Sequence, residues 1–172
     1  MGTLTSLPRE AIKGAGGIKY VLLSNYADTS TSIDADTGYV TIDTSVSTYW
    51  TKFTPRKESS NFAETETGTP ASGITSYNQV LTLVFAYNQT AKRNQLKVMG
   101  QSELKAVVVD RNDNAWALGF TNGLDLTGAT AGSGTAPTDM NGMTWTLSGN
   151  EPEPFGAVSS AVLGYITDAT NV

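Results

Sequence analysis

The feature that most constrains this chain is a long run at 76–87, S-Y-N-Q-V-L-T-L-V-F-A-Y. The run is β-branched or aromatic along most of its length, which fits the pleated, half-buried surface of a sheet and predicts a central strand. Thr, which also fits strands better than helices, is abundant throughout the chain. Charged residues make up only 16% of the 172 residues, against about 25% in ordinary soluble domains. The composition therefore predicts mainly β structure.

The remaining elements are predicted from alternation and turn residues along the chain. Further strands are expected at 18–23, 37–43, 46–54, 62–67, 104–109, 115–121, 143–148 and 161–166, and 123–142 is expected to be partly extended. Helical spacing is found at 90–99, where Leu96 and Met99 lie on one face and Thr90 can cap the first turn. The predicted fold is one domain over 1–172, an antiparallel β-sandwich or barrel with a single short helix.

Composition also excludes several classes of function. The chain has no Cys and no His, which excludes thiolate and His metal sites as well as Ser-His-Asp and Cys-His catalysis. The net charge of −5 argues against a dedicated nucleic-acid binder, which would normally carry a basic face. No secretion signal is found at the N-terminus and no apolar run is long enough to span a membrane, so a soluble product made inside a cell is expected.

The segment V-V-V-D-R-N-D-N-A-W-A-L at 107–118 begins like a calcium loop, because Asp110, Asn112 and Asn114 occupy alternate positions. An EF-hand loop also requires Gly at its sixth position and Glu at its twelfth, where this chain has Ala115 and Thr121. Asp and Asn are favoured at turns because they bond their own backbone and tolerate positive φ. The segment therefore predicts a hairpin turn, and no metal or other cofactor.

Two alternative functions remain open from the residues. The pairs Glu64 with Glu66, on one face of a predicted strand, and Glu151 with Glu153, in a Pro-containing loop, could serve a glycan hydrolase as paired carboxylates. A carbohydrate-binding or head-decoration module would instead need an exposed aromatic platform. The candidates for that platform are Trp50, Trp116 and Trp145.

The order of these segments resembles the tail-tube proteins of tailed bacteriophages, particularly those of phages that infect Bacteroidetes-type hosts. The matching features are Y-W-T-K-F-T-P-R-K-E-S-S-N-F-A-E-T at 49–65, the long strand at 76–87, the short basic helix, the 107–118 hairpin, and the Gly- and Thr-rich stretch that ends T-W-T-L-S-G-N-E-P. The resemblance covers nearly the whole chain and rests on strand patterns and turn placements. It includes no catalytic signature. In such proteins the turn after Asp-x-Asn often carries Gly, so the resemblance implies that Asn114 takes that left-handed position here.

The resemblance implies a structural virion protein without enzymatic activity. Its subunits would form rings, typically of six copies, whose sheets join into a channel for phage DNA. The expected partners are other copies of the chain and other tail, portal or connector proteins, while DNA would pass without sequence-specific binding. The expected location is the virion tail, assembled in the host cytoplasm, with no membrane contact and no cofactor.

Physical features of the sequence agree with assembly. Long strands with few charges can pair edge to edge between subunits, and a net acidic channel would repel phosphate so that DNA slides. Polar loops predicted at 25–36 and 57–75 are suitable arms for reaching a neighbouring subunit or ring. The charged residues in and beside these loops are the candidate assembly residues: Asp34, Asp36, Arg56, Lys57, Glu64 and Glu66.

Overall fold

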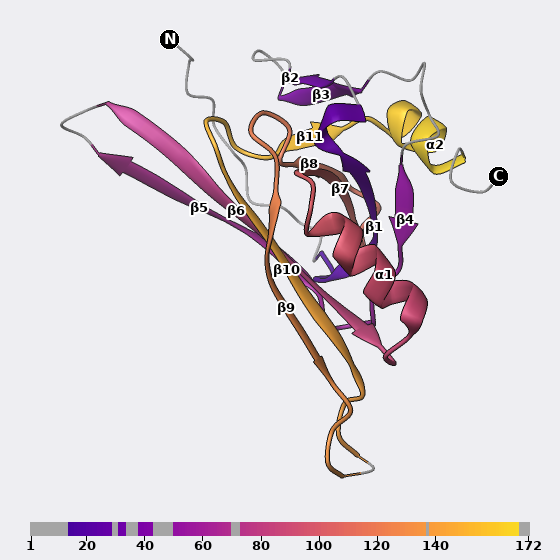
Figure 1. Cartoon of the computed structure of the whole chain (residues 1–172). Helices are drawn as coiled ribbons and strands as arrows, with labels where there is room; N and C mark the ends of the chain where they lie inside the picture. The colour runs from indigo at the N-terminus through magenta and orange to yellow at the C-terminus, as the bar shows by residue number, and fades with distance from the viewer. Residues whose placement is uncertain are drawn as a thin grey trace.

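The computed structural model describes residues 14–28, 31–33, 38–42, 50–69, 73–136 and 138–168. Two sheets pack face to face, so the predicted class, a mainly β sandwich, is confirmed (Figure 1). The described strand pairs are antiparallel as predicted except one, in which β3 and β11 are parallel. The first sheet has seven strands in the spatial order β2 (Thr31–Ile33), β3 (Tyr39–Ile42), β11 (Gly156–Val158), β8 (Ala115–Leu118), β7 (Leu104–Asp110), β1 (Ile18–Asn25) and β4 (Thr51–Phe53). The second has four, in the order β5 (Asn61–Thr69), β6 (Ile74–Ala86), β10 (Gly142–Glu151) and β9 (Asp125–Gly132).

The main core lies between the two sheets. Alternate residues of the first sheet, such as Val21 and Val108, meet alternate residues of the second, such as Leu81 and Leu83. Trp145 on β10 is fully buried at the centre of this cluster. Because side chains alternate across a strand, the other residues of β6 and β10 must face away from this core.

A second core lies on the opposite face of the seven-stranded sheet. Val107 and Val109 of β7 and Leu22 of β1 belong to it. The sheet is thus buried on both faces, which explains why residues 106–109, A-V-V-V, read as a continuous apolar run. The covering element is α2 (Ser160–Asp168), which contributes Ile166.

The helix α2 corrects the strand predicted at 161–166, which was wrong. Val162, Leu163 and Ile166 recur at helical spacing and all pack on the second core. Ser159 starts the helix, since its carbonyl accepts the Leu163 N–H at 2.9 Å and its hydroxyl accepts the Val162 N–H at 3.4 Å. The β-branched and aromatic residues of A-V-L-G-Y-I favoured a strand, and the Ser cap was the local signal against it.

The helix α1 (Thr90–Met99) has the predicted bounds and lies at one side of the sandwich, where Leu96 and Met99 pack against the main core (Figure 1). Its cap differs from the prediction. Gln89 is the N-cap residue, without a side-chain cap hydrogen bond, and Thr90 is already helical.

Both predicted loops contain regular structure. The 25–36 loop holds a 3-10 turn at Tyr26–Asp28 and the strand β2, so it was wrong to treat the whole segment as irregular. The 57–75 loop is largely the hairpin formed by β5 and β6, which pair antiparallel from Asn61 with Thr82 to Thr69 with Ile74. The strand predicted at 62–67 was therefore the better interpretation of this segment.

The strand predicted at 46–54 corresponds to β4 at Thr51–Phe53, and 43–49 lies outside the described residues. The one predicted over 115–121 ends earlier, at Leu118. The partly extended region 123–142 contains β9.

Candidate assembly surface

The outward face of the four-stranded sheet is built almost entirely from uncharged side chains. Many residues that pair across its strands carry hydroxyls or amides, as in the rows Thr82–Thr146 and Asn78–Asn150, and Val80 and Val84 add apolar side chains to the same face. The Asn78 side chain donates to the Asn150 side chain at 2.9 Å. Alternation places one carboxylate, Asp125, and no Lys or Arg among the described residues of this face.

This sheet ends in two long edge strands, β5 and β9, which pair on one side only within the described chain. Natural edge strands are usually protected by Lys, Pro, bulges or a covering element. The strand β9 reads D-L-T-G-A-T-A-G and has a bulge between its pairings with Thr146 and Leu147, but no Lys or Pro. Its last residues, from Ala129 onwards, are all exposed. The edge is open to pairing with another strand.

Two hairpins extend the sheet beyond the sandwich in opposite directions (Figure 1). The β5–β6 hairpin projects past the row in which Glu64 pairs with Gln79, and we call its described residues beyond that row, 65–69 and 73–78, the arm. At the other end, β9 and β10 lead to a loop around Asp139. The Asp139 carboxylate accepts N–H groups from Thr135 and Ala136, which lower its pKa.

The predicted assembly residues fall into separate places. Asp34 and Asp36 lie outside the described residues. Glu66 lies on the arm and is exposed, whereas Glu64 lies at the base of the arm and is half-buried. The exposed residues Arg56 and Lys57 lie towards the opposite end of the sheet, since the Arg56 N–H donates to the Val84 carbonyl at 2.7 Å. The partner of Glu66, Tyr77, is about 23 Å from Val84 along β6 at the usual strand rise.

One member of each carboxylate pair considered for hydrolysis is occupied by structural contacts. Glu64 accepts from the Gln79 side chain at 3.0 Å and from the Phe155 N–H at 2.7 Å. Glu151 is buried, and its two oxygens accept the N–H groups of Thr121, Asn122 and Gly123 at 2.9–3.1 Å. These bonds hold the 121–123 turn on the end of β10. Sequence reasoning missed this role because the partners lie about thirty residues apart in the chain.

The contacts of Glu151 lead to a prediction with a matched control. Glu151→Gln should lower the free energy of unfolding by about 2–3 kcal/mol, because the amide can accept fewer of the three N–H groups and brings an NH₂ against them. Glu153→Gln, two residues further along and exposed, should change stability by less than about 0.5 kcal/mol. Urea denaturation of both variants measures the difference. Equal stability of the two would show that the Glu151 contacts contribute nothing specific.

The three tryptophans do not form an exposed platform. Trp50 and Trp145 are buried, and Trp116 is half-buried with its ring packed edge-on against Phe155 at 5.2 Å. The condition that would have favoured a carbohydrate-binding module, an exposed Trp, is therefore not met.

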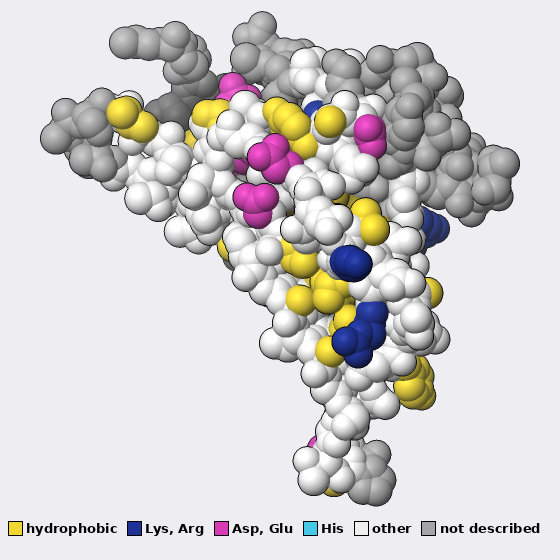
Figure 2. All heavy atoms as spheres, viewed as in Figure 1, with side chains coloured by type: hydrophobic (Ala, Val, Ile, Leu, Met, Phe, Trp, Pro, Cys, Tyr) yellow, Lys and Arg dark blue, Asp and Glu magenta, His cyan; other side chains and the backbone are white. Residues whose placement is uncertain are grey.

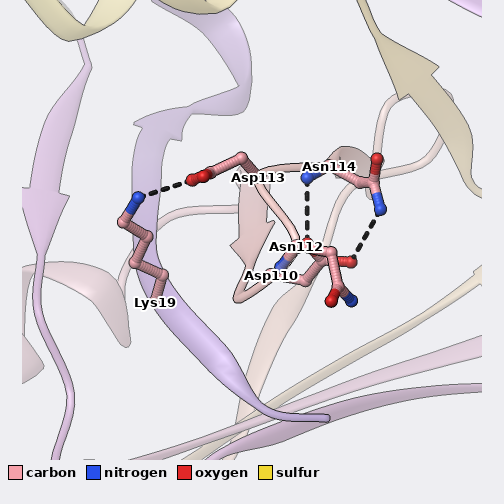
Figure 3. A network of polar contacts seen from close by, with 5 residues as sticks. All are labelled: Lys19, Asp110, Asn112, Asp113 and Asn114. Atoms are coloured by element: carbon pink, nitrogen blue, oxygen red, sulfur yellow. Dashed lines mark hydrogen bonds and ion pairs between the residues drawn. The ribbon is translucent and has the colours of Figure 1, made fainter. Parts of the chain in front are cut away.

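The 107–118 segment forms the predicted hairpin, in which β7 and β8 pair and the Asp110 N–H donates to the Asn114 carbonyl. Figure 3 shows the side-chain contacts of this turn, which join Asn114 to Asp110 and Asp113 to Lys19. The Asp110 carboxylate accepts the N–H groups of Asn112 and Asn114 at 2.8 and 2.9 Å. The left-handed residue is Asp113, with φ of 63°, and the expectation for Asn114 was wrong. Asp113 also pairs with Lys19 of β1, which ties the turn to the neighbouring strand.

The Asp110 carboxylate should make the turn acid-sensitive. Partial burial raises the pKa of Asp110, but the hydrogen bonds from Asn114 and Asn112 outweigh it and leave this pKa below its ordinary value. Its stabilisation is therefore complete above the unfolded-state pKa of about 3.9 and is lost as pH falls below it. Asp110→Asn should remove this part of the acid dependence, measured as unfolding free energy at pH 7 and pH 3. Calcium should leave the melting temperature of the wild type unchanged, and a calcium-dependent rise would reopen the metal interpretation.

Within the described part of the chain, no three Asp, Glu, His or Cys side chains gather closely enough to hold a metal ion. Among the same residues, no helix is long and apolar enough to cross a membrane. Comparison with family models, with curated proteins and with solved structures finds no match for this chain.

Proposed function

We propose that this chain is a structural virion protein whose copies form rings that build a phage tail tube or tail connector and line its DNA channel. The observation that carries the proposal is the four-stranded sheet, with its two long edge strands that pair on one side only within the described chain, and an outward face that carries no Lys or Arg among its described residues. The resemblance in segment order to tail-tube proteins supports the same function. The proposed partners are other copies of the chain, together with other tail or portal proteins.

The strand directions support closure of such a ring. The strands β5, β6, β10 and β9 alternate in direction because every neighbouring pair is antiparallel. In a rotationally symmetric ring, β5 of one copy therefore meets β9 of the next in antiparallel orientation, and the alternation continues without a break. With strands about 4.8 Å apart, a ring of about six copies would be roughly 40 Å across. A channel of that width can admit a DNA duplex.

The outward face of this sheet is suited to line the channel. The described residues of this face include no Lys or Arg, so the face offers no cation that would hold phosphate. The net charge predicted an acidic channel lining. Among the described residues of this face the one carboxylate is that of Asp125, so each copy would contribute this one negative charge. DNA would slide over such a face because phosphate finds no ionic partner there.

Assembly of the purified chain tests the proposal directly. We expect closed rings in negative-stain images and a discrete oligomer mass by sedimentation, at neutral pH and over a range of salt and protein concentrations. A strictly monomeric protein at high concentration under all these conditions would contradict the proposal.

A further inference from the structure

The sequence contains two Asn-Gly pairs, Asn122–Gly123 and Asn141–Gly142. An Asn followed by Gly is prone to spontaneous deamidation, because glycine has no side chain to hinder attack by its own backbone nitrogen. That nitrogen bonds to Cγ of the Asn side chain to form a succinimide ring, and the side-chain nitrogen leaves as ammonia, with the displaced proton transferred through water. A water molecule then opens the ring to Asp or to isoaspartate. The reaction therefore needs no reactant besides water.

The first pair lies in the turn between β8 and β9, and its reacting groups are bonded elsewhere. The Gly123 N–H donates to the Glu151 carboxylate at 3.1 Å, and the Asn122 N–H donates to the same oxygen at 2.9 Å. The Asn122 side-chain amide donates to the Asn150 carbonyl at 2.7 Å. Deamidation requires the Gly123 nitrogen to lose its proton and the Asn122 carboxamide to swing onto it. Both movements must first break these bonds.

The turn is also held from its other side. The Tyr26 hydroxyl donates to the Thr121 carbonyl. Gly123 has a φ of 88°, and a Cβ at this position would lie 3.3 Å from the Tyr26 ring, so the turn requires glycine here. Leu124, the next residue, exchanges both backbone hydrogen bonds with Leu104, at 2.8 and 2.9 Å. Together these contacts keep the turn in one conformation.

Exposure distinguishes two ways in which the turn could be protected. The Asn122 residue is exposed, so water for hydrolysis reaches it, whereas Glu151 is only 3% exposed. Protection of this Asn must therefore come from its hydrogen bonds and not from exclusion of water. The buried carboxylate of Glu151 is suited to this role, because its own oxygens have the N–H groups of the turn as partners.

The reaction product would not fit the closed turn. A new carboxylate at position 122 would lie beside the buried Glu151 and repel it, and isoaspartate would lengthen the backbone of the turn by one carbon. The surface there is already acidic: in Figure 2 the Asp and Glu side chains lie mostly above α1, in the part of the view that contains the β8–β9 turn, while Lys and Arg gather over α1. Deamidation would therefore open the turn irreversibly.

We propose that Asn122–Gly123 is a latent site of spontaneous deamidation and that Glu151 keeps it closed by holding the Gly123 N–H. Glu151 is a positioning residue, since it fixes the nitrogen and takes no part in the reaction. The site reacts in molecules whose turn has opened, and the reaction then makes the open state permanent. This inference is independent of the proposed assembly, because every contact that carries it lies within one subunit.

The second pair provides an internal reference in the same molecule. Asn141 is exposed as well, and Gly142 pairs with Ala86 and Gly132 inside the four-stranded sheet. It lies at the opposite end of β10 from Glu151, about 30 Å away at the usual strand rise. Its rate of deamidation therefore reports on opening of the sheet and not on opening of the turn.

Peptide mass spectrometry after incubation at neutral pH measures deamidation at both sites, in folded protein and in guanidinium chloride. We expect Asn122 of the folded wild type to react at least about tenfold more slowly than in the unfolded chain. Glu151→Gln should raise the folded-state rate at Asn122 by about tenfold or more, without the same rise at Asn141. Glu153→Gln is the matched control and should change neither rate. Tyr26→Phe, which loosens the other side of the turn and keeps Glu151, should raise the rate at Asn122 by a smaller factor.

Three results would overturn the proposal. The first is an equal rate at Asn122 in the folded and the unfolded wild type. The second is a Glu151→Gln variant that folds and whose Asn122 reacts no faster than in the wild type. The third is a parallel rise at Asn122 and Asn141, since this would show that Glu151 acts only through overall stability. If Glu151→Gln does not fold, an unchanged rate at Asn122 in Tyr26→Phe would overturn the proposal instead.

Discussion

One of two adjacent proline substitutions on β9, Thr130→Pro or Ala131→Pro, should abolish ring formation while leaving the subunit folded. In an antiparallel edge strand, successive N–H groups point alternately towards the partner strand and towards the open edge. One of the two prolines therefore breaks a bond to β10, and the other removes only an open-edge donor and blocks an approaching strand. Testing both variants ensures that one of them replaces the residue whose N–H points towards the open edge.

The measurement compares melting temperature with oligomer mass for both variants. We expect the open-edge proline to keep a melting temperature close to that of the dissociated wild-type subunit and to remain monomeric at ten times the concentration at which the wild type assembles. The other proline should be destabilised in the monomer itself. If both variants form rings like the wild type, the β9 edge is not the subunit contact, even though rings exist.

The largest expected effect on stability is that of Trp145→Ala. Trp145 is fully buried between the sheets, with its ring 4.5 Å from that of Phe85 and 6.0 Å from that of Phe53. Truncation to Ala should lower the free energy of unfolding by about 3–5 kcal/mol, because it removes the transfer free energy and leaves a cavity. The total stability of a domain is only about 5–15 kcal/mol, so much of the protein would be unfolded at moderate temperature.

A second substitution at the same position checks that this loss comes from packing. The indole N–H of Trp145 donates to no acceptor in the described chain. Trp145→Phe should therefore be much milder than Trp145→Ala, because it removes an unpaired polar group while keeping most of the ring. Val98→Ala on the exposed face of α1 should change stability by less than about 0.5 kcal/mol. Urea denaturation under monomeric conditions ranks the three variants by their free energy of unfolding. An equal loss of stability for Trp145→Phe and Trp145→Ala would contradict the packing explanation.

Elements with local signals could be predicted from the order of residues alone. The run at 76–87 lies within β6, the helix at 90–99 has the predicted bounds, and the Asp-Asn turn after Val109 closes the predicted hairpin. In each case the side chains that define the element are neighbours in the chain. Turn residues bond their own backbone, and a helical face is fixed by residues three and four apart.

Elements and contacts that depend on partners far apart in the chain became visible only in the folded protein. The segment A-V-L-G-Y-I became α2 because the second core offers an apolar face that a helix can cover, although its residues alone favoured a strand. Glu151, placed in a loop by its neighbouring prolines, is a buried acceptor for a turn about thirty residues earlier. The separation of Glu66 from Arg56 by the length of a strand could not be predicted either. Local propensity does not specify which surfaces meet, whereas burial and hydrogen bonding across the sandwich do.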